Sequence, residues 1–361
     1  MAISESEVLK ALRTVIDPDL HKDLVTLGMV KDVRIDGASV AFTVELTTPA
    51  CPLREEIEAM CQAAVGGIPG VGTIDITMTA RVRSTAGRGI PSQQPLPNVK
   101  NVIAIASGKG GVGKSTVSAN IACALAQSGA KVGLLDADIY GPSIPIIMGA
   151  EDEKPGVDEV KERLIPIERY GVKIISMGFL QPEGSAVIWR GPMVSKAVQQ
   201  FLRDVDWGEI DYLIVDLPPG TGDAQLTLAQ AIPLCGAVVV MTPQDLAAAV
   251  AVKAVAMFRR LDVPILGIVE NMSYFLCPTC SARHHVFSHG GGQQAAEALG
   301  VPFFGGIPLA VEIGAEADQG TPSVVINPDG PYAAAFREVA ERVAAQVSIR
   351  ARSFTPLTLA K

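Results

Sequence analysis

The chain has 361 residues, of which 48% are hydrophobic and 19% charged, as expected for a soluble globular protein long enough for two domains. Its formal net charge of −8 provides no overall basic field, which argues against nucleic acid as a partner. No stretch reaches the roughly 18 uninterrupted apolar residues of a membrane span, and the acidic N-terminus lacks a signal-peptide pattern, so we expect a cytoplasmic protein with no membrane partner.

Residues 1–83 predict a small α+β domain. Ser4 and Glu7 form a capping-box pattern before an amphipathic helix. Asp36-Gly37 stands between two apolar stretches and predicts a hairpin turn. The expected elements after the first helix are strands at Val30–Ile35 and Ser39–Leu46, a helix from Cys51-Pro52 to about Val65, and a half-buried strand from Ile74 to Val82.

Residues 84–98 read STAGRGIPSQQPLPN and predict a linker, because a segment with this many prolines and glycines buries little apolar surface. A long surface loop is the alternative. The linker leads into a second domain, expected over 99–347. Residues 348–361 are expected to form a loosely ordered tail.

Continuous apolar stretches alternate with helical patterns from Val99 onward. Strands of a parallel sheet covered on both faces have this composition. The sequence therefore predicts an α/β fold, a P-loop NTPase with a mostly parallel sheet flanked by helices. The expected strands are Val102–Ala106, Val132–Leu135, Tyr212–Leu217, Ala237–Met241 and Pro264–Val269.

The stretch SGKGGVGKST follows the first of these strands and precedes a helix expected over Lys114–Gln127. It fits the P-loop pattern, in which backbone N–H groups at a helix N-terminus surround phosphate. Lys114 is expected to reach the β- and γ-phosphates, Ser115 to bind Mg²⁺, and Thr116 to lie near the α-phosphate. The expected ATP-binding residues of the loop are Gly108, Lys109, Gly110, Gly111, Val112, Gly113, Lys114, Ser115 and Thr116.

Two other predicted strands end in carboxylates. VGLLDADIYGPS ends its strand at Asp136 and places Asp138 two residues later. YLIVDLPPGTGD is an apolar strand that ends at Asp216, the setting of a Walker B carboxylate beside Mg²⁺. Together with the P-loop, these aspartates indicate nucleotide chemistry.

The sequence contains six cysteines, too few for a disulfide scaffold in a chain of this length, so free or metal-bound thiols are expected. Cys277 and Cys280 form a Cys-x-x-Cys pair. It could be a redox dithiol, or half of a zinc site completed by histidines. It could also be half of a site shared by two copies, whose four thiolates would suit a 4Fe–4S cluster. The candidate histidines are His284, His285 and His289.

Residues 109–114 read KGGVGK. The additional lysine, Lys109, gives this loop its resemblance to the deviant Walker A motif of ParA/MinD-class dimerising ATPases. The resemblance implies that Lys109 reaches the partner's phosphates across a nucleotide-sandwich dimer and that Asp138 positions the attacking water. It also implies that Asn271 contacts adenine and that residues 220–223 form a switch. The resemblance thus implies catalytic roles for Lys109, Lys114 and Asp138.

Residues 99 to about 345 resemble the Mrp/ApbC family of iron–sulfur cluster carriers through GKGGVGKST, DADIYGPS, WRGPMVSKA, DLPPGTGD and VENMSYFLCPTC. The segment around Cys51 resembles the small iron–sulfur-assembly domain often fused ahead of these ATPases. The resemblance implies a homodimer that holds a labile 4Fe–4S cluster on Cys277 and Cys280, hydrolyses ATP slowly, and works with cluster-assembly machinery and apo iron–sulfur proteins. A positioning ATPase of the ParA/MinD kind and an ATPase with structural zinc are the alternatives.

Overall fold

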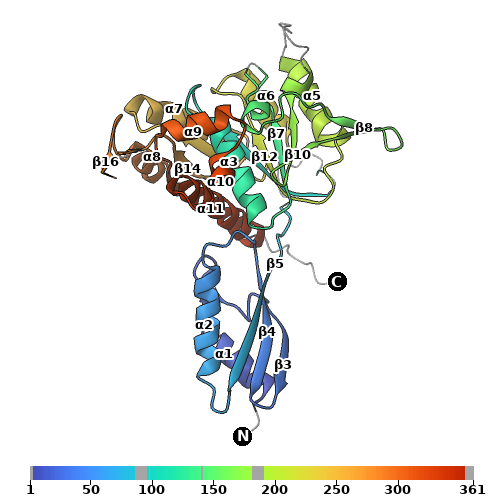
Figure 1. Ribbon diagram of the computed structural model, residues 1–361, viewed down its shortest axis with the longest axis vertical. Coiled ribbons are helices and arrows are strands. Elements are labelled where there is room, and N and C mark those ends of the chain that lie inside the picture. Colours follow the sequence, from blue (N-terminus) through green and yellow to red (C-terminus); the bar gives the residue numbers. More distant parts are fainter. Residues whose placement is uncertain are drawn as a thin grey trace. The chain divides into compact units, whose positions relative to one another are not determined.

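The computed structural model describes residues 3–85, 96, 98–139, 141–180, 191–277, 279–280 and 282–353 (Figure 1). The chain divides into two compact units. Unit 1 comprises residues 1–83 with 344–361, and unit 2 comprises residues 84–343. Among the described residues, no helix combines the length and apolar character needed to cross a membrane.

Unit 1 begins with helix α1 (Glu5–Leu12), and the predicted capping box is present. The Ser4 hydroxyl accepts the Glu7 N–H at 3.3 Å, while the Glu7 carboxylate accepts the Ser4 N–H at 2.9 Å. Two otherwise unpaired backbone donors are thereby satisfied at the start of the helix. The helix buries Val8 and Leu12 against the rest of the unit.

The sheet of unit 1 has the strand order β3-β4-β5, with β3 and β4 antiparallel and β4 and β5 parallel. Every second residue of β4 is buried, as the alternating pattern predicts. A further short pair, β1 with β2, was not expected from the sequence. The remaining elements of this unit are β1 (Ile16–Asp17), β2 (Lys22–Asp23), β3 (Val30–Asp36), β4 (Ser39–Leu46), α2 (Arg54–Gly66) and β5 (Thr73–Ala80).

Unit 2 is built on an eight-stranded sheet with the order β10-β11-β7-β12-β6-β13-β14-β17. All neighbours in it are parallel except β10 with β11. The predicted P-loop NTPase fold class is confirmed. The strands are β6 (Val99–Ala106), β7 (Val132–Asp136), β10 (Ile167–Arg169), β11 (Val172–Ser176), β12 (Ile210–Asp216), β13 (Gly236–Met241), β14 (Ile265–Glu270) and β17 (Phe303–Gly306), with the separate hairpins β8 (Gly156–Asp158)–β9 (Arg163–Ile165) and β15 (Phe275–Leu276)–β16 (Arg283–His284).

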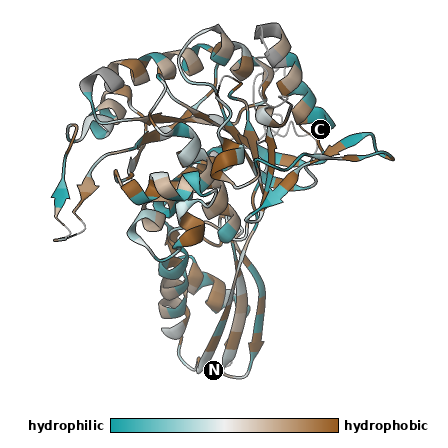
Figure 2. Cartoon of the chain, turned by 45° about the horizontal axis from the view of Figure 1, so that its top comes forward, coloured by the Kyte–Doolittle hydropathy of each residue, from teal (hydrophilic) through white to brown (hydrophobic). Residues whose placement is uncertain are grey.

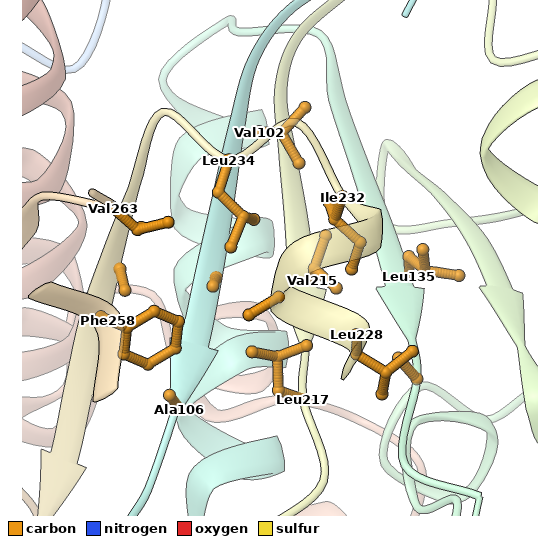
Figure 3. Close-up of a cluster of buried hydrophobic side chains, with 14 of the residues drawn as sticks. Val102, Ala106, Leu135, Val215, Leu217, Leu228, Ile232, Leu234, Phe258 and Val263 are labelled. Carbon is orange, nitrogen blue, oxygen red and sulfur yellow. The ribbon is translucent and has the colours of Figure 1, made fainter. Parts of the chain in front are cut away.

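Helices cover both faces of this sheet, with α6 in front of the strands and α3 behind them in Figure 3. Leu228 and Ile232, from α6 and its C-terminal cap, face Val215 and Leu135 of the strands, and all four side chains are fully buried. The strands form an apolar layer, shown brown in Figure 2. The helices of unit 2 are α3 (Lys114–Gln127), α4 (Ile144–Ile147), α5 (Gly191–Asp204), α6 (Asp223–Ala231), α7 (Asp245–Arg260), α8 (Gly291–Leu299), α9 (Val311–Asp318), α10 (Ser323–Ile326) and the start of α11 (Pro331–Ser353), with a 3₁₀ turn at Met177–Leu180.

The predicted tail boundary at residue 348 is wrong, because it falls inside α11, which continues to Ser353. Val343, Val347 and Ala351 are buried at a spacing of four residues, so one apolar face continues along the helix. Residues 354–361 lie outside the described residues. Of the predicted linker, 86–95 and residue 97 also lie outside them.

Candidate functional site

The P-loop lies at the carboxyl end of β6 and leads into α3, as the sequence predicts. It borders an open cavity of about 420 Å³, a size typical of small-ligand sites. The predicted residues Lys109, Lys114, Ser115, Thr116 and Asp138 all line this cavity. The other lining residues are Ser107, Gly110, Gly111, Val112, Gly113, Gly141, Ser143, Ile146, Ile147, Pro219, Gly314, Ala317 and Asp318.

Two glycines of the loop are required by close contacts. A Cβ on Gly108 would lie 2.4 Å from Cγ1 of Val250 on α7. Gly113 has φ of +75°, a backbone conformation that side chains disfavour, and its Cβ would lie 2.3 Å from Nδ2 of Asn271. The glycine pattern therefore allows the loop to pass tightly between α7 and the end of β14.

Lys114 and Asp216 form a buried ion pair, with Nζ 2.7 Å from Oδ2 and side-chain exposures of 6% and 0%. Ser115 donates its hydroxyl to the same carboxylate oxygen at 2.6 Å. Ser118, one turn further along α3, donates to the other oxygen at 2.6 Å. The predicted Walker B residue, Asp216, thus lies directly beside the predicted Mg²⁺ ligand, Ser115. A hydroxyl and a carboxylate oxygen are suitable ligands for Mg²⁺.

Asp136, at the end of β7, is fully buried beside these residues. Burial and, next, the negative charge of Asp216 raise the pKa of its carboxyl to about 7. Ser176 of β11 donates its hydroxyl to Asp136 at 2.9 Å, and the Asp138 N–H donates at 3.1 Å. The two strand-end carboxylates and Lys114 therefore form one coupled group of charges below the phosphate cavity.

Lys109 and Asn271 differ in their placement. Lys109 borders the cavity, and its ammonium makes no ion pair within the part of the chain that the structure describes. Asn271 is buried, does not line the cavity, and donates its side-chain amide to the carbonyl of Val112 at 2.8 Å. The predicted adenine contact of Asn271 stays a prediction. The hydrogen bond to Val112 attaches Asn271 to the P-loop.

Sequence reasoning missed several residues of this site. Ser118 follows Lys114 by four positions, so helical spacing could have placed it on the same face. No local sequence pattern indicates a place in the site for Ser176 or for the α9 residues Gly314 and Asp318. They reach the site only because of the order of the strands and the return of the chain after β17.

Cys277 and Cys280 lie between the two strands of the β15–β16 hairpin, whose strand β16 is labelled at the left in Figure 1. The Cys277 thiol is half-buried and the Cys280 thiol is exposed. The N–H groups of Cys280 and then Thr279 donate to the Cys277 sulfur and lower the pKa of that thiol. The structure thus favours a thiolate at Cys277, the form that binds metal. Pro278 lies outside the described residues.

No group of three or more His, Cys, Asp or Glu side chains arranged for a metal ion occurs within the described part of the chain. His285 and His289 contact each other, with their Nδ1 atoms 3.2 Å apart, and both are exposed. The described residues of one copy therefore provide no third protein ligand for the thiol pair.

The remaining cysteines are not part of this hairpin. Cys61 and Cys123 are fully buried, and burial raises the pKa of each thiol to about 12, so both are core thiols. Cys235 is half-buried. In unit 1, Cys51 is also half-buried and lines a narrow cavity with Asp17 and Asp19.

Two family models match the chain. Residues 98–344 match the model described as NUBPL iron-transfer P-loop NTPase, and residues 5–76 match the model described as iron–sulfur cluster assembly protein. Nucleotide hydrolysis is general among P-loop NTPases.

Related proteins and solved structures indicate the same family. An iron–sulfur cluster carrier protein from Deinococcus radiodurans is 48% identical over 97% of both chains. A nucleotide-binding protein from Archaeoglobus fulgidus, solved in complex with ADP and with Co, is 44% identical, with a TM-score of 0.56 over 62% of this chain and 88% of that one. The cell division ATPase MinD from Pyrococcus furiosus is 24% identical, with a TM-score of 0.51 over 67% of this chain and 98% of that one, and shows the fold. The chain belongs to the NUBPL-type family of iron-transfer P-loop NTPases.

Proposed function

We propose that the protein is an ATP-hydrolysing carrier that holds a labile 4Fe–4S cluster between two copies of the chain and passes it to apo iron–sulfur proteins. The observation that carries the proposal is the thiol hairpin of Cys277 and Cys280. One of its thiols is exposed, the other has a lowered pKa, and the described chain supplies no third ligand beside them. Such a site binds soft metal and leaves it accessible for transfer.

Four cysteine thiolates complete the usual ligand set of a 4Fe–4S cluster. Two copies of the hairpin related by a two-fold axis would provide these four from Cys277 and Cys280 alone. The resemblance of the KGGVGK loop to dimerising ATPases supports the same symmetry, with Lys109 of each copy reaching its partner's nucleotide. The relative from Deinococcus radiodurans is an iron–sulfur cluster carrier protein, which supports this cargo.

In this proposal ATP occupies the cavity above the P-loop, with Lys114 on the β- and γ-phosphates. Oγ of Ser115 lies 2.6 Å from Oδ2 of Asp216, and these two residues would hold Mg²⁺. The ion would neutralise phosphate charge during hydrolysis. Asp138 borders the cavity and would position the attacking water. Hydrolysis is slow and coupled to cluster handling. The protein works in the cytoplasm with cluster-assembly machinery and needs neither nucleic acid nor a membrane. The division into a small domain over 1–83 and an ATPase domain from 99 belongs to this proposal.

Anaerobic reconstitution with iron and sulfide tests the proposal. The wild-type chain is expected to bind about four iron and four sulfide per dimer. Cys277→Ala and Cys280→Ala are expected to bind none, whereas Cys61→Ala, which alters a core thiol, is expected to retain the cluster. If both hairpin variants keep the cluster, the proposal is wrong, and a stoichiometric zinc content in anaerobically purified protein would indicate a structural metal.

A further inference from the structure

Glu270 is a buried carboxylate, 2% exposed, at the end of β14. The Ser273 hydroxyl donates to its Oε1 at 2.5 Å, and the Gly292 N–H donates to its Oε2 at 2.5 Å. These two donors stand at the two ends of residues 274–291, here called the thiol segment, which carries the Cys277–Cys280 hairpin and the paired histidines. One carboxylate therefore ties together the beginning and the end of the thiol segment.

The packing around this carboxylate leaves little space for adjustment. A Cβ on Gly292 would lie 2.8 Å from Cβ of Glu270, and a Cβ on Gly306 would lie 2.5 Å from Oγ of Ser273. Gly292 belongs to the first turn of α8, whose free N–H groups favour a negative charge. The geometry at the base of the thiol segment is consequently set by close contacts as well as by hydrogen bonds.

Asn271, the next residue, connects this base to the P-loop. Its backbone N–H donates to the Met241 carbonyl at 2.8 Å, and its side-chain amide donates to the Val112 carbonyl at 2.8 Å. The amide also fills the space that a Cβ on Gly113 would need. A displacement of the P-loop on nucleotide binding would therefore act on the residue adjacent to Glu270.

A second connection reaches the other side of the nucleotide cavity. The Leu309 N–H donates to the Tyr274 carbonyl at 2.7 Å, and Phe275 forms a parallel bridge with Leu309. Two residues later α9 begins, and its residues Gly314 and Asp318 line the phosphate cavity. The thiol segment is thus attached to elements on both sides of the cavity.

We propose that Glu270 is a positioning residue that fixes the base of the thiol segment and makes metal retention by Cys277 and Cys280 depend on the nucleotide state of the P-loop. The inference rests on the proposed function. Glu270→Met tests it, because methionine has a similar length and shape but no oxygen that could accept the Ser273 hydroxyl or the Gly292 N–H. Ser273→Ala removes only one of the two hydrogen bonds. Gln293→Ala is the matched control, since this exposed side chain on α8 makes a hydrogen bond only to Glu297 among the described residues.

The experiment uses the full-length chain reconstituted anaerobically with iron and sulfide. Iron loss to a chelator is timed with and without a non-hydrolysable ATP analogue, and Mg–ATP affinity is measured by calorimetry. Hydrogen exchange of the thiol segment is followed in the same two nucleotide states. The wild-type chain and Gln293→Ala are expected to show nucleotide-dependent iron loss and exchange.

Glu270→Met is expected to keep its Mg–ATP dissociation constant within about threefold, to lose iron about tenfold faster, and to show no nucleotide effect on either readout. Ser273→Ala is expected to lose iron about threefold faster and retain part of the effect. The inference is overturned if Glu270→Met keeps the full nucleotide effect, if ATP affinity and thermal stability fall in parallel with iron retention, or if nucleotide changes neither readout in the wild type. A wild-type chain that holds no cluster would contradict the proposed function, while the exchange comparison would still decide the coupling.

Discussion

Asp136→Asn provides a quantitative test of the charge arrangement below the phosphate cavity. The Asp136 pKa is raised from 3.8 to about 7, first by burial and then by the Asp216 carboxylate. The folded state therefore keeps this proton between about pH 4 and pH 7, where the unfolded state has already released it. The stabilising contribution is complete below about pH 4 and is lost as the pH rises to about 7. Asparagine resembles the protonated form and removes this dependence.

The magnitude follows from the shift. At about 1.36 kcal/mol per pKa unit, the change from 3.8 to about 7 corresponds to about 4 kcal/mol of unfolding free energy. Between pH 5 and pH 8 the unfolding free energy of the wild-type unit should fall by about 3 kcal/mol more than that of the variant, because part of the titration lies below pH 5. Titrating groups outside the cluster of Asp136, Asp216 and Lys114 are common to both proteins, so their contributions cancel in the difference.

Urea unfolding followed by tryptophan fluorescence measures this difference in unit 2 alone. The sequence contains two tryptophans, and both belong to that unit. Trp207 is 3% exposed and donates its indole N–H to the Phe201 carbonyl at 3.1 Å, so its emission should change on unfolding. If the difference in unfolding free energy between the wild type and Asp136→Asn stays constant from pH 5 to pH 8, the raised pKa of Asp136 is refuted.

Two further changes test the loop and the thiols. Gly113→Ala should weaken Mg–ATP binding by at least about tenfold in calorimetry, because φ of +75° disfavours a side chain and its Cβ would lie 2.3 Å from the Asn271 amide; an unchanged affinity would mean that the loop accommodates the methyl group. Alkylation at pH 7, mapped by mass spectrometry, should modify Cys277 first, whereas Cys61 and Cys123, each with a pKa of about 12, should stay unmodified until the chain unfolds. Early modification of Cys61 would contradict its placement in the core of unit 1.

Features encoded by neighbouring residues were predictable. The predicted helix over Lys114–Gln127 has the same bounds as α3, because a glycine-rich loop before it and an apolar helical pattern within it mark both ends. The hairpin about Asp36-Gly37 likewise agrees with β3 and β4. Local turn chemistry and residue periodicity are sufficient for such elements.

Features that depend on distant residues were not predictable to the same extent. Ser176 contacts Asp136 across two adjacent strands, and α9 lines the phosphate cavity from a segment about 200 positions after the P-loop. β17 was not expected, because half of its residues, Gly305 and Gly306, are glycines with low strand propensity. The error at residue 348 was avoidable, since Val343, Val347 and Ala351 continue the helical apolar spacing.

The most direct test of the central claim is to measure iron content and molecular mass together on one anaerobic sample separated by size. The account predicts that iron and sulfide, about four of each per two chains, elute only with the dimer. It also predicts that Cys280→Ala elutes without iron. Iron or zinc bound stoichiometrically to a monomeric chain would contradict the claim that Cys277 and Cys280 form half of a shared site.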